Sequence, residues 1–221
     1  MAGAGVVFDL DGTLVDTNYL HALAWARSLH DAGERPVPMS VIHRVIGMGS
    51  ERLVTRLVGR PSEEVIEGHS RHFDQLRQDL VGFPGAADLL AAVHARGVKV
   101  VLATSAKAKD VEPMLDVVGA PREAIDHIVH SGDVERSKPA PDVFQAALDG
   151  AGLDAATTVA VGDTVWDVEA AGRCGLGCVA VLTGGIGRPE LEEAGALAVY
   201  DDVGELLAGL DDSPIGRLFD H

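Results

Sequence analysis

From residue 83 onward, short apolar runs of strand length alternate with segments of helical pattern, and few folds accommodate this alternation. Strands are predicted at 98–103, 128–129, 158–161, 178–182 and near residue 197. Helices are predicted at about 85–96 and 109–118, after Pro139, at 165–173, and near the C-terminus up to about residue 210. Strands that are separated by single helices form parallel sheets with helices on both faces. This part of the chain is therefore predicted to be an α/β unit.

One more strand precedes this unit, and the segment between them has a different character. Residues 6–10 form an apolar run that ends in carboxylates, which predicts a buried strand with polar groups at its end. Residues 17–80 show helical spacing, with Asp16 or Thr17 as the candidate N-cap of a first helix and a break at Pro36 and Pro38. No strand is predicted there. We expect an α/β core of residues 1–15 and 83–221 with a helical insert at 16–82.

Composition restricts the class of function. The net charge of −16 over 221 residues argues against a nucleic-acid partner, because phosphate backbones are bound by basic surfaces. No apolar run approaches the ~18 residues of a membrane span, and residues 1–5 do not look like a signal peptide. We therefore expect a cytoplasmic protein without a membrane partner. Cys174 and Cys178 are expected to be packing residues, and the tail at 211–221 is expected to be mobile.

The negative charge is unevenly distributed along the chain. Between Thr17 and Gly82, eight arginines and no lysine balance eight aspartates and glutamates, so the excess of acid lies in the rest of the chain. An acidic core that handles an anionic substrate needs a cation or local arginines to offset repulsion.

Chemically active side chains stand near the ends of four predicted strands. They are Asp9 and Asp11 at the first strand, Thr104 and Ser105 after the second, Lys138 near the third, and Asp163 and Asp167 after the fourth. Ligands of open parallel sheets bind beyond the carboxyl ends of the strands, so these residues are predicted to meet in one site. Each has a structural alternative as a turn residue, a helix cap or a solvated charge. Their joint occurrence in this order favours a functional site.

The motifs Asp9-x-Asp11-Gly12-Thr13, Thr104, Lys138 and Gly162-Asp163-x-x-x-Asp167 make the sequence resemble the haloacid dehalogenase superfamily over essentially its whole length. The resemblance implies a Rossmann-like parallel sheet with an inserted α-helical cap at residues 16–82. It also implies a Mg²⁺-dependent phosphatase that hydrolyses a small phosphorylated metabolite through an aspartyl-phosphate intermediate.

The resemblance implies catalytic roles that suit the residue types. Asp9 would be the nucleophile, since a carboxylate can split hydrolysis into two easier steps. Asp11 would protonate the leaving oxygen and then deprotonate the attacking water. Lys138 would place a compact positive charge on the transferring phosphoryl group, and Thr104 would donate a hydrogen bond to it.

The resemblance also implies a metal site. Asp9, the backbone carbonyl of Asp11, and Asp163 match the positions of Mg²⁺ ligands, with Asp167 positioning a bound water or supporting Lys138. An all-oxygen ligand set suits this hard cation.

The residues argue against three other classes of protein in the superfamily. Dehalogenases of the superfamily lack a carboxylate two residues after the nucleophile, so Asp11 argues for phosphoryl transfer. Phosphonatases of the superfamily use a cap lysine, and this insert has none. A non-catalytic relative is expected to have lost Asp9, Asp11 or Lys138, all of which are present.

A sugar phosphomutase of the β-phosphoglucomutase type stays open as the alternative. The pattern Asp16-Thr17-x-x-x-His21-x-x-x-Trp25 resembles the opening cap helix of that enzyme. The mutase would need an arginine near Ser50 for a distal phosphate, and the nearest is Arg52. We therefore favour the phosphatase.

Substrate contacts are predicted from Thr104, Ser105, His21 and Arg52. For His21 the alternative is packing on a helix face, and for Arg52 it is a solvent-exposed turn between two helices. A helical cap favours small phosphates such as phosphoglycolate, sugar phosphates or nucleoside monophosphates. The sequence selects neither among them nor an oligomeric state.

Overall fold

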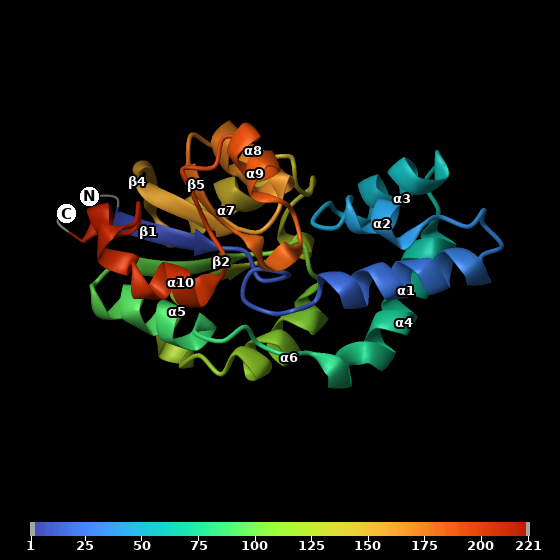
Figure 1. Ribbon diagram of the computed structural model, residues 1–221, viewed down its shortest axis with the longest axis horizontal. Coiled ribbons are helices and arrows are strands. Elements are labelled where there is room, and N and C mark those ends of the chain that lie inside the picture. Colours follow the sequence, from blue (N-terminus) through green and yellow to red (C-terminus); the bar gives the residue numbers. More distant parts are fainter. Residues whose placement is uncertain (1–2, 220–221) are drawn as a thin grey trace.

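The computed structural model describes residues 3–219, and its larger lobe is built on a six-stranded parallel sheet (Figure 1). The strands are β1 (Gly3–Phe8), β2 (Lys99–Ala103), β3 (His127–Val129), β4 (Leu153–Gly162), β5 (Gly177–Val181) and β6 (Ala198–Tyr200). Their order in the sheet is β3-β2-β1-β4-β5-β6, and every neighbouring pair is parallel. The predicted α/β fold class is confirmed.

Helices cover both faces of this sheet (Figure 1). One face packs against α5 (Ala86–Ala95), α6 (Ala108–Val118) and α10 (Val203–Ala208), and the other against α7 (Asp142–Ala151), α8 (Val165–Arg173) and α9 (Arg188–Glu193). Along β1 the side chains alternate: Val6 and Phe8 belong to the first core cluster and Val7 to the second. Because both faces of the strand are buried, its sequence is continuously apolar.

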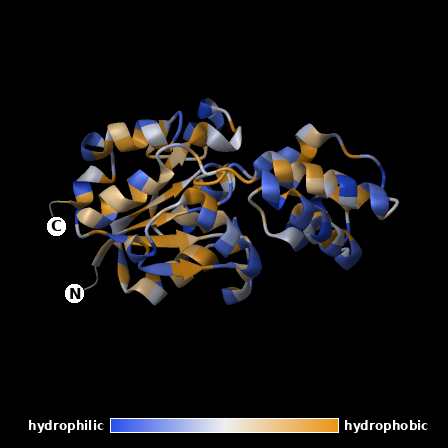
Figure 2. Ribbon diagram, turned by 90° about the horizontal axis from the view of Figure 1, so that it is seen from below, coloured by the Kyte–Doolittle hydropathy of each residue, from blue (hydrophilic) through white to orange (hydrophobic). Residues whose placement is uncertain are grey.

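The insert between β1 and β2 forms a second lobe of four α-helices followed by a short 3₁₀ turn. The helices are α1 (Asn18–Asp31), α2 (Met39–His43), α3 (Ser50–Val58) and α4 (Glu63–Leu76), and none of residues 18–80 lies in a strand. They enclose a small apolar core of their own that includes Trp25 and Ile42, while hydrophilic residues face outward (Figure 2). We call this lobe the cap.

The two longest cap helices lie against each other. Ser28 of α1 donates a hydrogen bond of 2.6 Å to the backbone carbonyl of Val65 on α4. A Cβ at Gly68 would collide with the Ser28 hydroxyl, so glycine permits the close approach. The packing of α1 on α4 brings residues that are far apart in sequence to one side of the cap.

The chain enters and leaves the cap at adjacent points. Val15 and Gly82 form an antiparallel bridge, and the amide of Asp16 donates to the carbonyl of Val81 at 2.9 Å. These contacts support division of the chain at residues 16 and 82, which we keep as a proposal.

The prediction of a mobile tail was wrong for its described part. Short 3₁₀ turns at Leu210–Asp212 and Gly216–Leu218 lie in this part of the tail, and Ile215 and Leu218 are buried in the first core cluster. The two apolar residues are three positions apart, so one 3₁₀ turn directs both toward the sheet. The predictions for residues 1, 2, 220 and 221 lie outside the described residues.

The fourth strand and the two cysteines follow the predictions closely. Strand β4 begins at Leu153, earlier than predicted, with an irregular register against β1. Cys178 is buried in the second core cluster and Cys174 packs against it, both as free thiols. Among the described residues, no helix has the length and apolar character that crossing a membrane requires.

Candidate active site

The side chains predicted from strand ends meet at the carboxyl edge of the sheet, beneath the cap. They are Asp9, Asp11, Thr104, Ser105, Lys138, Asp163 and Asp167, and His21 joins them from the cap. Asp9, Thr104, Lys138, Asp163 and Asp167 are all buried. They come together because β1, β2 and β4 are adjacent and parallel, so their carboxyl ends share one edge.

Lys138 connects two of the carboxylates. Its Nζ lies 2.5 Å from Asp9 Oδ1 and 2.7 Å from Asp167 Oδ1, and it donates to the carbonyl of Ala103 at 3.1 Å. Only 1% of the lysine side chain is exposed. Burial alone would lower the pKa of Lys138, but Asp167 and Asp9 raise it above its ordinary value, so the ammonium stays charged.

Asp167 is fixed by the start of α8. Its Oδ2 accepts hydrogen bonds from the amide of Thr164 at 3.1 Å and from the hydroxyl of Thr164 at 2.5 Å, which completes a capping box. A Cβ at Gly162 would collide with this side chain. Asp167 thus caps the helix with one oxygen and pairs with Lys138 through the other, so the capping alternative is realised beside the contact with Lys138.

Asp163 is held from two directions. Thr13 donates to its Oδ1 at 2.9 Å, and Asn18 Nδ2 donates to its Oδ2 at 2.8 Å. Side chains at Gly12 or Gly184 would collide with the carboxylate. Asn18 was not predicted as a site residue. The available signal was a polar residue at the first position of α1, next to the point where the chain enters the cap.

The buried carboxylates form a potential metal site. Asp9, Asp163 and Asp167 each offer one oxygen, and these oxygens lie within 4.8 Å of one another. Burial raises the pKa of Asp9 to about 8, with Lys138 opposing the shift and Asp167 and Asp11 adding to it. Burial, together with Asp167 and Asp9, raises the pKa of Asp163 well above its ordinary value.

Charge and donor type both suit a divalent cation at this place. If ionised, three buried carboxylates facing one ammonium leave two negative charges uncompensated. Buried charges require partners, and oxygen-only donors favour a hard ion of the Mg²⁺ type. The residues therefore fit the metal that the sequence predicts.

Asp11 is surrounded by hydrogen-bond donors. Thr17 donates to its Oδ1 at 2.8 Å, Thr104 donates to its Oδ2 at 3.1 Å, and His21 Nε2 lies 2.9 Å from Oδ1. Burial would raise the pKa of Asp11, but the hydrogen bonds from His21, Thr17 and Thr104 lower it overall. Thr17 occupies the N-cap position of α1, yet its hydroxyl serves Asp11 instead of the helix.

The cap contributes an aromatic wall. The rings of His21 and Phe73 stack with centroids 4.0 Å apart, and those of Trp25 and His69 stack at 3.9 Å. His21 Nδ1 also lies 3.1 Å from His69 Nε2. His69 and Phe73 were not predicted as site residues. Their spacing of four residues on α4 repeats that of His21 and Trp25 on α1, which was the only sequence signal.

The pocket between cap and core is small. It encloses a cavity of about 80 Å³ and is lined by the aromatic wall, by Asp9, Asp11, Ser105 and Lys138, and by Met48, Ser70, Lys107 and others. Arg52 is not among the lining residues; it is exposed on α3 and lines an adjoining wider cleft that shares Ser50, Ser105 and Lys107 with the pocket. Arg52 thus lies apart from the carboxylates and Lys138, and Ser105 is the candidate residue that lines the same cleft.

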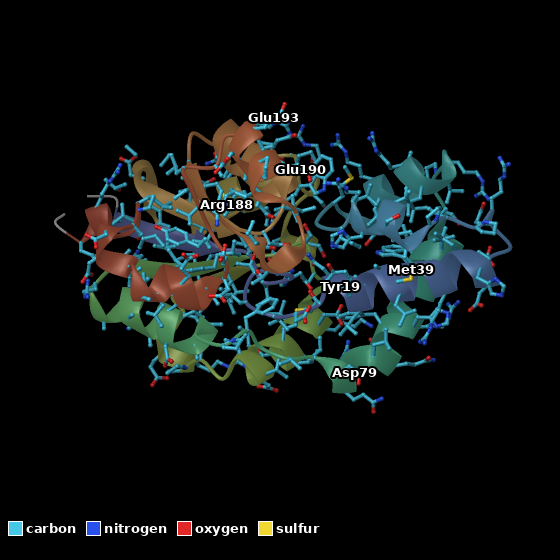
Figure 3. All side chains as sticks on the ribbon, in the orientation of Figure 1. Tyr19, Met39, Asp79, Arg188, Glu190 and Glu193 are labelled. Atoms are coloured by element: carbon cyan, nitrogen blue, oxygen red, sulfur yellow. The ribbon has the colours of Figure 1, made fainter. Side chains whose placement is uncertain are left out.

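Polar contacts join cap and core on both sides of the pocket. On one side, Lys107 donates to Ser70 at 2.8 Å and Lys109 pairs with Asp74 at 2.9 Å. On the other side, Arg44 of the cap pairs with Glu190 of α9, which is labelled in Figure 3 beside the gap between the lobes. The cap is therefore closed over the strand ends in this structure.

The fold and the site define an α/β protein with a helical cap and an aspartate pair at the end of the first strand. The chain belongs to the haloacid dehalogenase-like hydrolase family, whose sequence model matches residues 4–175. The predicted superfamily is confirmed, and with it the prediction of a hydrolase of this family.

Individual relatives are similar over most of the chain. A phosphoglycolate phosphatase of Pseudomonas fluorescens is 31% identical over 215 residues, which is 92% of this chain and 78% of that protein. A hydrolase from Pseudomonas syringae superposes with a TM-score of 0.89 at 34% identity, covering 95% of this chain and 98% of the other. CbbY from Rhodobacter sphaeroides, in complex with phosphate, gives a TM-score of 0.78 at 27% identity, with 94% and 99% covered.

Proposed function

We propose that this enzyme is a Mg²⁺-dependent phosphatase that hydrolyses a small phosphorylated carboxylate of the phosphoglycolate type through an aspartyl phosphate on Asp9. The observation that carries the proposal is the arrangement around Asp9. Lys138 donates a hydrogen bond to one oxygen of Asp9, and Asp163 and Asp167 lie beside the same carboxylate. Asp11, two residues after Asp9 in the sequence, contacts His21 of the cap.

In the first step a carboxylate oxygen of Asp9 attacks phosphorus. A bond from this oxygen to phosphorus forms, the ester bond breaks, and Asp11 delivers a proton to the departing alkoxide. In the second step Asp11 takes a proton from water as the water oxygen forms a bond to phosphorus. The bond between phosphorus and the Asp9 oxygen breaks, which releases inorganic phosphate and regenerates the Asp9 carboxylate. Lys138 keeps its charge in the buried site and stabilises the negative charge that develops on the phosphoryl oxygens.

Mg²⁺ would be held by Asp9, Asp163 and the backbone carbonyl of Asp11, with Asp167 close by. When bound, it would supply the positive charge that allows a carboxylate and a phosphate dianion to approach each other. The protein's own part is to hold the ligands in place: Thr13 and Asn18 orient Asp163, and the capping box orients Asp167.

The pocket supports a compact leaving group that carries negative charge. Its small volume limits the size of this group, and Lys107 with Ser70 provides an ammonium and a hydroxyl on the wall beyond Asp11. A carboxylate on the leaving group could accept hydrogen bonds from both. The similarity to phosphoglycolate phosphatases supports the same substrate class.

The mutase alternative has less support. A phosphomutase must hold a second phosphate on the same sugar, and arginine is suited to that task. None of the described residues that line the pocket is an arginine. Both activities share the chemistry on Asp9, so an assay must separate them.

The test measures phosphate release from phosphoglycolate, glucose 6-phosphate and adenosine monophosphate, and in parallel the interconversion of glucose 1-phosphate and glucose 6-phosphate. We expect the highest kcat/KM for phosphoglycolate and no interconversion. Asp9→Asn is expected to retain less than about one hundredth of the activity, because an amide cannot form the acyl phosphate. Asp16→Asn, at an exposed aspartate in the same segment, is the matched control. Interconversion faster than phosphate release would overturn the proposal.

A further inference from the structure

Behind the pair of Asp11 and His21 stands a second histidine. His21 Nε2 lies 2.9 Å from Asp11 Oδ1, and His21 Nδ1 lies 3.1 Å from Nε2 of His69. The three side chains form one hydrogen-bonded series that runs from the core, through α1, to α4. His69 does not contact Asp11 itself, so any influence on the acid–base group passes through His21.

Stacking restricts the orientation of both imidazoles. The ring of His21 lies on Phe73 with an interplanar angle of 11°, and the ring of His69 lies on Trp25 with an angle of 18°. Flat aromatic contacts of this kind limit rotation of the rings out of their planes. Each ring nitrogen of His21 is thus directed at a partner, one at His69 and the other at Asp11.

The surroundings of His69 favour its neutral form. Burial lowers its pKa well below 6.5, and positive charge on His21, on Lys107 and Lys109 at the start of α6, and on His72 of its own helix would lower it further. A neutral imidazole has one bare nitrogen and one N–H. It can therefore accept a hydrogen bond from His21 Nδ1–H, which a charged histidine or a lysine cannot do.

We propose that His69 is a positioning residue for the acid–base step: by accepting from His21 Nδ1, it keeps His21 Nε2 aligned on Asp11. The inference rests on the proposed function. This alignment keeps His21 Nε2 2.9 Å from Asp11 Oδ1, and Asp11 is the group that the proposed function assigns to deliver the proton to the alkoxide. Esters with poor leaving groups depend on this proton, whereas a nitrophenolate departs without one.

The kinetic test compares wild type, His69→Phe and His69→Gln on phosphoglycolate and 4-nitrophenyl phosphate. Phenylalanine retains a flat ring for stacking on Trp25 but accepts no hydrogen bond, and glutamine restores an acceptor. Loss of one neutral hydrogen bond corresponds to roughly a tenfold effect. We expect kcat/KM of His69→Phe to fall about tenfold more for phosphoglycolate than for the aryl ester, and His69→Gln to recover most of that difference.

Equal loss on both esters, or no loss on either, would overturn the proposal, because a purely structural role affects both leaving groups alike. A second measurement covers the case of a variant that does not fold. In wild-type protein with ¹⁵N-labelled histidine, a scalar coupling across the hydrogen bond between His21 Nδ1 and His69 Nε2 is expected, and its absence would contradict the proposal. If wild type hydrolyses neither ester, the proposed function fails. The scalar coupling still shows whether the hydrogen bond between His21 and His69 exists.

Discussion

Replacing Asp9 with asparagine is expected to stabilise the metal-free protein while it removes activity. Asp9 shares its buried site with Asp163 and Asp167, and its pKa is raised from 3.8 to about 8, first by burial. The folded protein must therefore either bury an unfavourable charge or bind a proton there. An amide avoids both, and its oxygen can still accept the hydrogen bond from Lys138.

The direction and size follow from proton linkage. Between pH 3.8 and about 8 the folded state holds a proton on Asp9 that the unfolded state has released, so the free energy of unfolding falls as pH rises. The free energy of unfolding falls by about 1.36 kcal/mol for each pH unit above 3.8, so at pH 7 the loss is at most about 4 kcal/mol. In a chain of this length 1 kcal/mol shifts Tm by roughly 2–4 °C. Asp9→Asn should therefore raise Tm by several degrees.

The assay is urea and thermal unfolding of chelator-treated protein at pH 5, 7 and 8.5, followed by circular dichroism. The free energy of unfolding of Asp9→Asn should exceed that of wild type by an amount that increases from pH 5 to 8.5. Asp16→Asn, at an exposed position, should show no such increase. Added Mg²⁺ should stabilise wild type more than Asp9→Asn. A variant that is less stable than wild type at pH 8.5, or an advantage that does not change with pH, would refute the reasoning.

Three further outcomes are expected. Chelation should abolish phosphate release and Mg²⁺ should restore it better than Ca²⁺, whose looser coordination suits the site less well; full activity after chelation would contradict a metal role for Asp163. Asn18→Ala should weaken Mg²⁺ binding about tenfold by calorimetry, because Asp163 loses the donor at 2.8 Å; unchanged affinity would place Asn18 outside the metal site. Arg52→Ala should raise KM for glucose 6-phosphate more than KM for phosphoglycolate, because Arg52 lines the wider cleft that adjoins the small pocket; equal effects on both would leave Arg52 without a role in selecting the substrate.

The core of the site was predictable from sequence because a parallel sheet brings strand ends to one edge. Lys138 reaches Asp9 across 129 positions of sequence, yet its place after the third strand was enough to predict the meeting. Asp167 is similar, since the interval from Asp163 places it in the first turn of the helix that follows β4.

The cap side of the site was less accessible to prediction. His69 meets His21 only because α1 packs closely on α4, and that approach depends on Gly68 facing Ser28. Helical periodicity predicts which residues share a face of one helix but not the angle or register between two helices. The buried tail was missed for a related reason, since Ile215 finds its partners only in the folded core.

The bridge between Val15 and Gly82 has a consequence for how this enzyme could be re-engineered. Because the two ends of the inserted segment lie side by side, one continuous stretch of sequence can be exchanged without changing the connectivity of the sheet or the position of the nucleophile strand. A lobe transplanted from another protein would need only a similar end-to-end spacing to be accommodated. Asp11 and Asp163 would then need substitutes for His21 and Asn18, since these partners would leave with the exchanged segment.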